Sequence, residues 1–236
     1  MNPIRLAKRV KNRMVGVKPV RPVEVQCPRV YLGSRYGGWH VHGDSVGPES
    51  VVYAAGVGED TSFDEAVISQ IGCTVHAFDP TPRAIAYVDR KRSEGGLDDR
   101  FRLYPWAIAP EDGRATFHLP RNTEHVSASL HESGMTGTEA IEVECRSLAS
   151  IMAELGHERI DVLKLDIEGA EYEVLEELAG GAVRPGQILF ETHDGMFSDG
   201  RAKSERMLKK LGDAGYRVFA VDHYGREYSM IHDSVV

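Results

Sequence analysis

Short apolar runs alternate with amphipathic segments along most of the chain. Apolar runs rich in β-branched residues predict buried strands, and apolar residues at three- and four-residue spacing predict helices. The predicted strands are 50–55, 73–79, 100–108, 111–119, 142–148, 160–166, 187–192, 216–222 and 227–233. The predicted helices are 59–72, 80–94, 149–156, 170–181 and 202–215.

This order of elements indicates the fold class. Strands that alternate with helices of this length form βαβ units and a mostly parallel sheet. The last two strands are joined only by the short loop His-Tyr-Gly-Arg, 223–226, so the final strand should run antiparallel, at or near the sheet edge. We therefore predict an α/β, Rossmann-like sheet of seven mostly parallel strands with an antiparallel final strand.

The regular alternation begins only at residue 50, which suggests two regions. A length of 236 residues and a hydrophobic fraction of 42% fit one large domain better than two small ones. We assign residues 50–236 to this domain. Residues 1–49 are predicted to be a basic arm and a proline-rich linker that pack on the core.

Charge is unevenly distributed. The net charge is −8, but residues 1–35 contain nine Lys or Arg and one acid, a net +8, which leaves −16 for the rest. The basic amphipathic stretch 1–14 could bind an anionic membrane weakly or pack on its own acidic domain. An acidic body disfavours an extended nucleic-acid surface, so no nucleic-acid partner is expected.

Targeting features are few. No apolar run reaches the roughly 20 residues that span a bilayer, and the N-terminus lacks the apolar stretch of a secretory signal. Cys27, Cys73 and Cys145 are widely spaced and odd in number, which favours a reducing compartment. We predict a cytoplasmic protein, with peripheral membrane contact through the basic N-terminus as an alternative.

The loop after the first buried strand is a candidate cofactor site. Gly56 and Gly58 allow a tight turn and a close approach of backbone to a ligand. Glu59 and Asp60 follow, with Ser62 at the start of the next helix. Two carboxylates there would repel a pyrophosphate but suit a cationic ligand such as S-adenosylmethionine. The alternative is that these polar residues cap the helix.

Two further strand ends could contact the same ligand. Asp79, followed by Pro80, lies 21 residues after Gly58, a spacing at which an acid can accept the hydroxyls of a ribose. Trp106 and Ala107 could flank an adenine ring, although core packing of Trp106 is nearly as plausible.

Several of these segments resemble the FkbM-type S-adenosylmethionine-dependent methyltransferases. The likeness runs from about Val51 to Val221, and its most specific part is IDVLKLDIEGAEYEVLEEL, which contains D-[IV]-E-G-x-E. HAFDPTP, YPWAIAPEDGRATFH, VECRSLASIM and QILFETH follow in the family's order, while YGGWHV and GVGEDTSFDEA are similar to one subgroup. Ala54 and Asp60 depart from the family's usual Asp and Gly.

The resemblance implies a class I methyltransferase fold, S-adenosylmethionine as cofactor, and methyl transfer to a hydroxyl of a sugar, a glycan or another small metabolite. Such an acceptor needs a base or a metal to remove its proton. Asp166 and Glu168 at one strand end, and Glu191 and His193 at the next, are the candidate catalytic residues.

Two uses of this group compete. His193 could be a general base that Asp166 or Glu191 orients, which we prefer. Alternatively, Asp166, Glu191 and His193 could bind Mg²⁺ or another divalent cation. Two other functions also stay open: a nicotinamide-dependent oxidoreductase, and a non-catalytic protein with a vestigial cofactor cleft.

Overall fold

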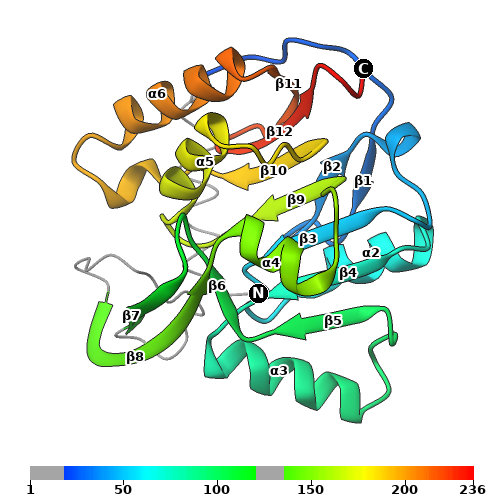
Figure 1. The fold of residues 1–236 in the computed structure, drawn as a ribbon, viewed down its shortest axis with the longest axis vertical. Coiled ribbons are helices and arrows are strands. Elements are labelled where there is room, and N and C mark those ends of the chain that lie inside the picture. The colour runs from blue at the N-terminus through cyan, green and yellow to red at the C-terminus, as the bar shows by residue number, and fades with distance from the viewer. Residues whose placement is uncertain (1–18, 121–135) are drawn as a thin grey trace.

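The computed structural model describes residues 19–120 and 136–236, so the basic stretch 1–14 lies outside the described residues. A seven-stranded sheet forms the centre of the protein, with the strand order β11-β12-β10-β9-β3-β4-β5 (Figure 1). The strands are β3 (Val51–Ala55), β4 (Thr74–Phe78), β5 (Phe101–Tyr104), β9 (Val162–Leu165), β10 (Gln187–Glu191), β11 (Tyr216–Val221) and β12 (Glu227–His232).

The sheet confirms the predicted fold class. Neighbouring strands from β10 to β5 pair in parallel, whereas β12 pairs antiparallel with both β10 and β11. The final strand lies one position inside the edge, because the crossover through α6 (Gly200–Asp213) places β11 beyond it and the chain then returns between β11 and β10. The edge strand is therefore β11.

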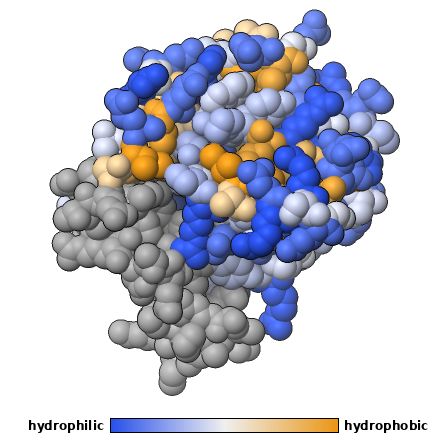
Figure 2. All heavy atoms as spheres, turned by 90° about the horizontal axis from the view of Figure 1, so that it is seen from below, coloured by the Kyte–Doolittle hydropathy of each residue, from blue (hydrophilic) through white to orange (hydrophobic). Residues whose placement is uncertain are grey.

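Two apolar layers cover the sheet. One layer contains buried residues of α4 (Leu148–Leu155), α5 (Glu171–Gly180) and α6. The other contains buried residues of α2 (Ser62–Gln70) and α3 (Pro82–Ser93). Only two residues of α3 are buried, and the face of the molecule on the side of α3 and β5 is mostly hydrophilic, with hydrophobic residues gathered near its middle (Figure 2).

A hairpin before residue 50 belongs to the second layer. It consists of β1 (Val30–Leu32) and β2 (Trp39–Val41), followed by the 3₁₀ turn η1 (Gly43–Ser45). Leu32, Trp39 and Val41 are buried in the same cluster as Phe219 of β11 and Leu189 of β10. Upstream, Glu24 N–H donates to the Val218 carbonyl at 2.7 Å. Residues 19–49 thus pack along the β10–β11 half of the sheet.

The predicted strand 100–108 is wrong as a single element. It breaks at Pro105, which has no N–H to continue the ladder. Before the break, β5 belongs to the main sheet. After it, β6 (Trp106–Ile108) joins β7 (Gly113–Pro120) and β8 (Thr136–Arg146) in a separate three-stranded sheet.

Within the described ranges, no helix combines the length and the apolar character needed to cross a bilayer.

Gly56 provides a test of how the sheet centre is packed. Its φ is +82°, and a Cβ atom there would lie 1.8 Å from the Asp166 carbonyl oxygen. Gly56→Ala should therefore lower the free energy of unfolding by about 2–5 kcal/mol, measured by urea denaturation. Gly47→Ala is the matched control, because nothing lies within 4 Å of its added Cβ and its φ is not positive. Equal stability of the two variants would contradict this packing.

Candidate active site

The candidate site lies where the strand order reverses. The chain continues from β3 to β4 and β5 on one side, and from β9 to β10 on the other, so the switch point falls between β3 and β9. Ligands of open α/β sheets bind beyond the carboxyl ends of strands at this point. Gly56 and Asp166 follow these two strands directly, and Asp166 N–H donates to the Ala55 carbonyl at 3.1 Å.

Asp79 organises the glycine loop at the end of β4. One carboxylate oxygen accepts hydrogen bonds from the N–H groups of Val57 and Gly58, both at 3.0 Å. The other accepts from Thr81 N–H at 2.9 Å and from the Thr81 hydroxyl at 2.6 Å. All four acceptor positions of the carboxylate are engaged. A ribose hydroxyl would have to replace or share one of these contacts, and the Thr81 hydroxyl can rotate away most easily.

Glu59 and Asp60 bind other parts of the protein. Glu59 forms an ion pair with Arg83 at 2.7 Å, and the hydrogen bond from Arg83 lowers the pKa of Glu59. Asp60 accepts from Ser62 N–H at 2.8 Å and from the Ser34 hydroxyl at 3.1 Å. The Asp60 contact to Ser62 supports the helix-capping alternative.

Ser62 also connects the glycine loop to the β1–β2 hairpin. Its hydroxyl accepts a hydrogen bond from Ser34 N–H at 2.9 Å. The glycine loop is therefore tied to the turn of the β1–β2 hairpin through two side chains, Asp60 and Ser62.

Trp106 and Ala107 face different surroundings. Ala107 is buried with Phe117, Val143 and Cys145 in the core of the small sheet, so its side chain offers little surface to an adenine ring. Successive residues of a strand point to opposite faces, which turns the half-buried Trp106 the other way. Trp106 stacks on Tyr104 with ring centroids 5.1 Å apart and remains the aromatic candidate.

The loop after β9 holds backbone strain. Glu168 has φ +55° and Gly169 has φ +102°, and Glu168 is the sole non-glycine residue with positive φ in the described ranges. A non-glycine residue in this conformation costs about 1–3 kcal/mol and persists where the surroundings fix it. Such strain is concentrated at functional sites.

Glu171 fixes this loop. Its carboxylate is buried, with 1% of the residue exposed, and accepts hydrogen bonds from Ile167 N–H at 2.6 Å and Gly169 N–H at 2.8 Å. This role of Glu171 is not among those predicted from the sequence. The available signal was the last acid of the D-I-E-G-x-E string, which reaches back from the first turn of α5 much as a capping-box glutamate does.

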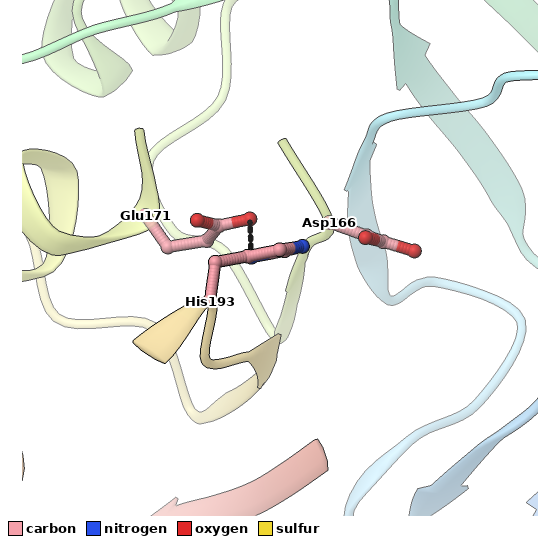
Figure 3. Close-up of side chains that lie close together, drawn as sticks. All are labelled: Asp166, Glu171 and His193. Atoms are coloured by element: carbon pink, nitrogen blue, oxygen red, sulfur yellow. Dashed lines mark ion pairs between the residues drawn. The ribbon is translucent and has the colours of Figure 1, made fainter. Parts of the chain in front are cut away.

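His193 lies among carboxylates beyond the end of β10, next to the 3₁₀ turn η2 (Asp194–Met196). Its Nδ1 is 3.3 Å from Glu171 Oε1, and its Nε2 is 3.4 Å from Glu168 Oε2 and 4.0 Å from Glu191 Oε2. Figure 3 shows Glu171 beside one ring nitrogen, while the Asp166 carboxylate is directed away from the ring.

These neighbours decide the charge of His193. Burial lowers its pKa, but the charge of Glu171 and the close contacts with the Glu168 and Glu171 carboxylates outweigh burial and raise the pKa well above the usual 6.5. The surrounding carboxylates therefore favour the protonated imidazole at neutral pH. A protonated imidazole cannot accept a proton, so this geometry argues against the preferred role of His193 as the general base.

The remaining strand-end acids hold their protons more tightly than usual. Burial raises the pKa of Asp166, and burial together with Asp166 raises the pKa of Glu191 to about 7. Lys164 is buried beside them and donates to the Gly56 carbonyl at 2.9 Å, while Arg226 lies 3.6 Å from Glu191. The site is thus rich in carboxylates that few cations neutralise.

The structure brings together a different set of possible metal ligands from the set predicted from the sequence. Asp166, Glu171 and His193 offer donor atoms within 4.8 Å of one another, whereas Glu191 does not belong to that group. Both Glu171 oxygens already accept backbone N–H groups, and the surrounding carboxylates raise the pKa of His193, which favours its protonated form. Metal binding requires a neutral imidazole, so these residues fit an ion pair better than a divalent cation.

Comparison with known proteins finds one methyltransferase family over most of the chain. The model of the methyltransferase FkbM domain matches residues 50–218. The 31-O-demethyl-FK506 methyltransferase FkbM of Streptomyces tacrolimicus is 30% identical over 182 residues, which are 65% of this chain and 69% of that protein.

Two further relatives match shorter parts. The 2-O-methyltransferase NoeI of Sinorhizobium fredii is 30% identical over 148 residues, which are 57% of this chain and 58% of that protein. The probable methyltransferase-like protein 24 of Rattus norvegicus is 32% identical over 144 residues, which are 60% of this chain. This chain spans only 32% of that longer protein.

The ion pairs of His193 predict how its pKa responds to substitution of its neighbours. In Glu171→Gln the pKa of His193 should fall, because the main charge that raises it is removed, whereas Glu177→Gln, at an exposed position of the same helix, should leave it unchanged. NMR titration of the ring protons measures both. A raised folded pKa also means that the pairing stabilises the fold fully below pH 6.5 and that this stabilisation is lost as pH rises through the folded value. An unchanged pKa in Glu171→Gln would refute the ion pair.

Proposed function

Because the chain belongs to the FkbM methyltransferase family, we propose that it transfers a methyl group from S-adenosylmethionine to a hydroxyl oxygen of a sugar, a glycan or another small metabolite. The observation that carries this proposal is the meeting, at one switch point, of a glycine loop held by Asp79 with a group of strand-end carboxylates. The names of two relatives specify O-methylation, at a 2-O and a 31-O position of their own substrates.

The residues at the switch point fit the cofactor. The left-handed backbone conformation of Gly56 allows the glycine loop to lie against the Asp166 backbone. The N–H group of Gly58 in this loop donates to Asp79 at the end of β4. An acid at this position suits a ribose, and Trp106 offers an aromatic face nearby. When bound, S-adenosylmethionine supplies a methyl group activated by a positively charged sulfur.

The local charge also suits this cofactor. Glu59 is matched by Arg83, so the negative charge near a bound sulfonium comes from the ends of β9 and β10 instead. Asp166 and Glu191 lie there, and a nearby cation would favour their ionised forms. A carboxylate-lined site repels the pyrophosphate of a nicotinamide dinucleotide, which disfavours the oxidoreductase alternative together with the family assignment.

His193 acts as a positioning residue in this proposal. Its ring connects Glu171, which fixes the loop, with Glu168 and Glu191, which lie at the edge of the site. Proton removal from the acceptor then falls to a carboxylate at the strand ends, where a pKa near neutrality suits a general base. Asp166 faces the switch point and would orient the acceptor beside the methyl group.

Calorimetric titration with S-adenosylhomocysteine, using NAD as the control ligand and repeating both after EDTA treatment, tests the cofactor. We expect micromolar binding of S-adenosylhomocysteine, no binding of NAD, and no effect of EDTA. Binding of NAD alone would overturn the assignment, and binding of neither ligand would support a vestigial cleft. A loss of binding or of turnover after EDTA would restore the divalent cation.

Asp166→Ala tests the catalytic role of the strand end. Turnover, followed as S-adenosylhomocysteine release with a panel of methyl glycosides, should fall at least about 100-fold. The free energy of unfolding should change by no more than about 1 kcal/mol, because the main-chain contacts of Asp166 remain. Asp213→Ala, at an exposed position of α6, is the control and should keep wild-type turnover. Wild-type turnover in Asp166→Ala would eliminate the assigned role.

A further inference from the structure

A cavity of about 260 Å³ lies between the β1–β2 hairpin and the turn that joins β11 to β12. Tyr31, Trp39 and His40 line it from the hairpin. Asp222, Tyr224 and Glu227 line it from the turn. Pockets for drug-sized ligands usually measure about 300–1,000 Å³, so this cavity suits a molecule of about one ring.

The cavity adjoins the strand ends of the candidate active site. Glu227 is the first residue of β12 and lies directly opposite Glu191, the last residue of β10. Side chains at directly opposed positions of antiparallel strands have Cβ atoms about 4.5–5.5 Å apart. Burial, together with the neighbouring charges of Asp222, Glu191 and Asp166, raises the pKa of Glu227 to about 8.

This pair of glutamates is costly for the fold. Like charges directly opposite one another destabilise a sheet. Arg226 lies near Glu191, but within residues 19–120 and 136–236 no hydrogen bond or ion pair involves the Glu227 carboxylate. Burial and the neighbouring acids therefore favour the protonated form of Glu227 in the absence of a ligand, and a nearby cation would favour its ionised form.

The backbone that carries Glu227 is firmly held. Asp222 accepts hydrogen bonds from Tyr224 N–H at 3.1 Å, from Arg226 N–H at 2.7 Å and from Glu227 N–H at 3.1 Å. A single carboxylate thus fixes the turn. Glu227 is presented at the cavity from a rigid position, which a catalytic group requires.

The opposite wall can recognise a ring that carries hydroxyl groups. Tyr31 is 42% exposed and meets His40 edge-to-face with ring centroids 5.1 Å apart. His40 Nδ1 is buried and has no hydrogen-bond partner in the described structure. This atom has almost no accessible surface and does not face the cavity, so hydroxyl groups of a ligand would meet the carboxylates of Asp222 and Glu227 on the facing wall. Aromatic faces beside hydrogen-bonding groups suit a pyranose-like molecule.

We propose that this cavity binds the methyl acceptor as a pyranose-sized ring and that Glu227 is the catalytic residue that takes the proton from its hydroxyl. The inference rests on the proposed methyl transfer. A positive charge on the bound cofactor would favour the ionised form of Glu227. The acceptor oxygen loses its proton to this carboxylate and bonds to the methyl carbon, while the carbon–sulfur electron pair stays with sulfur. The products are a methyl ether, S-adenosylhomocysteine and protonated Glu227, which returns its proton to water.

The test measures S-adenosylhomocysteine binding and methyl transfer to methyl glycosides of several hexoses, 6-deoxyhexoses and pentoses, with the full chain. In Glu227→Gln, kcat should fall at least about 100-fold while the Kd for S-adenosylhomocysteine stays within about threefold. Tyr31→Ala should raise KM for the glycoside about 3- to 10-fold. Tyr36→Ala is the matched control, because this tyrosine is 53% exposed on the same hairpin but does not line the cavity.

The outcomes separate this inference from the proposed function. Absence of S-adenosylhomocysteine binding to the wild type would remove the proposed function itself. With binding intact, a kcat of Glu227→Gln within threefold of wild type would overturn the role of Glu227. Equal KM values for Tyr31→Ala and Tyr36→Ala would overturn the cavity as the acceptor site, as would the failure of every glycoside to react.

Discussion

The candidate site depends on the buried carboxylate of Glu171. It accepts the N–H groups of Ile167 and Gly169, and so holds a loop in which Glu168 adopts a left-handed conformation. The same carboxylate faces His193 at 3.3 Å and keeps that imidazole charged. The Glu171 side chain therefore determines the backbone conformation after β9 and the charge of His193 after β10. Its loss would disturb both.

The charge of the site follows from this arrangement. Carboxylates lie at the ends of β9, β10 and β12, and the described cations beside them are Lys164, His193 and Arg226. Burial makes ionisation of the acids costly, and the charge of Glu171 favours the protonated form of His193. Such a surplus of buried acid destabilises an unliganded fold, but it is well suited to a positively charged cofactor and to taking a proton from a neutral hydroxyl.

The β1–β2 hairpin links the two halves of the proposed site. Its turn contacts the glycine loop, where Ser34 hydrogen-bonds to Asp60 and Ser62, while its strands form one wall of the cavity beside β11 and β12. The hairpin therefore contacts both the glycine loop and the cavity. The hairpin precedes residue 50, where the family match begins, so the match by itself does not include this wall.

The sequence alone determined the fold class, the position of the glycine loop and the strand ends, because periodicity and glycine placement are local properties. It also identified Asp79, Asp166, Glu191 and His193 as residues at one edge of the sheet. Tertiary structure decided their partners: Glu59 pairs with Arg83, Ala107 turns into the small-sheet core, and Glu171 holds His193. Only the insertion of β12 between β10 and β11 brings Glu227 opposite Glu191, since strand order, unlike strand propensity, depends on where distant segments pack.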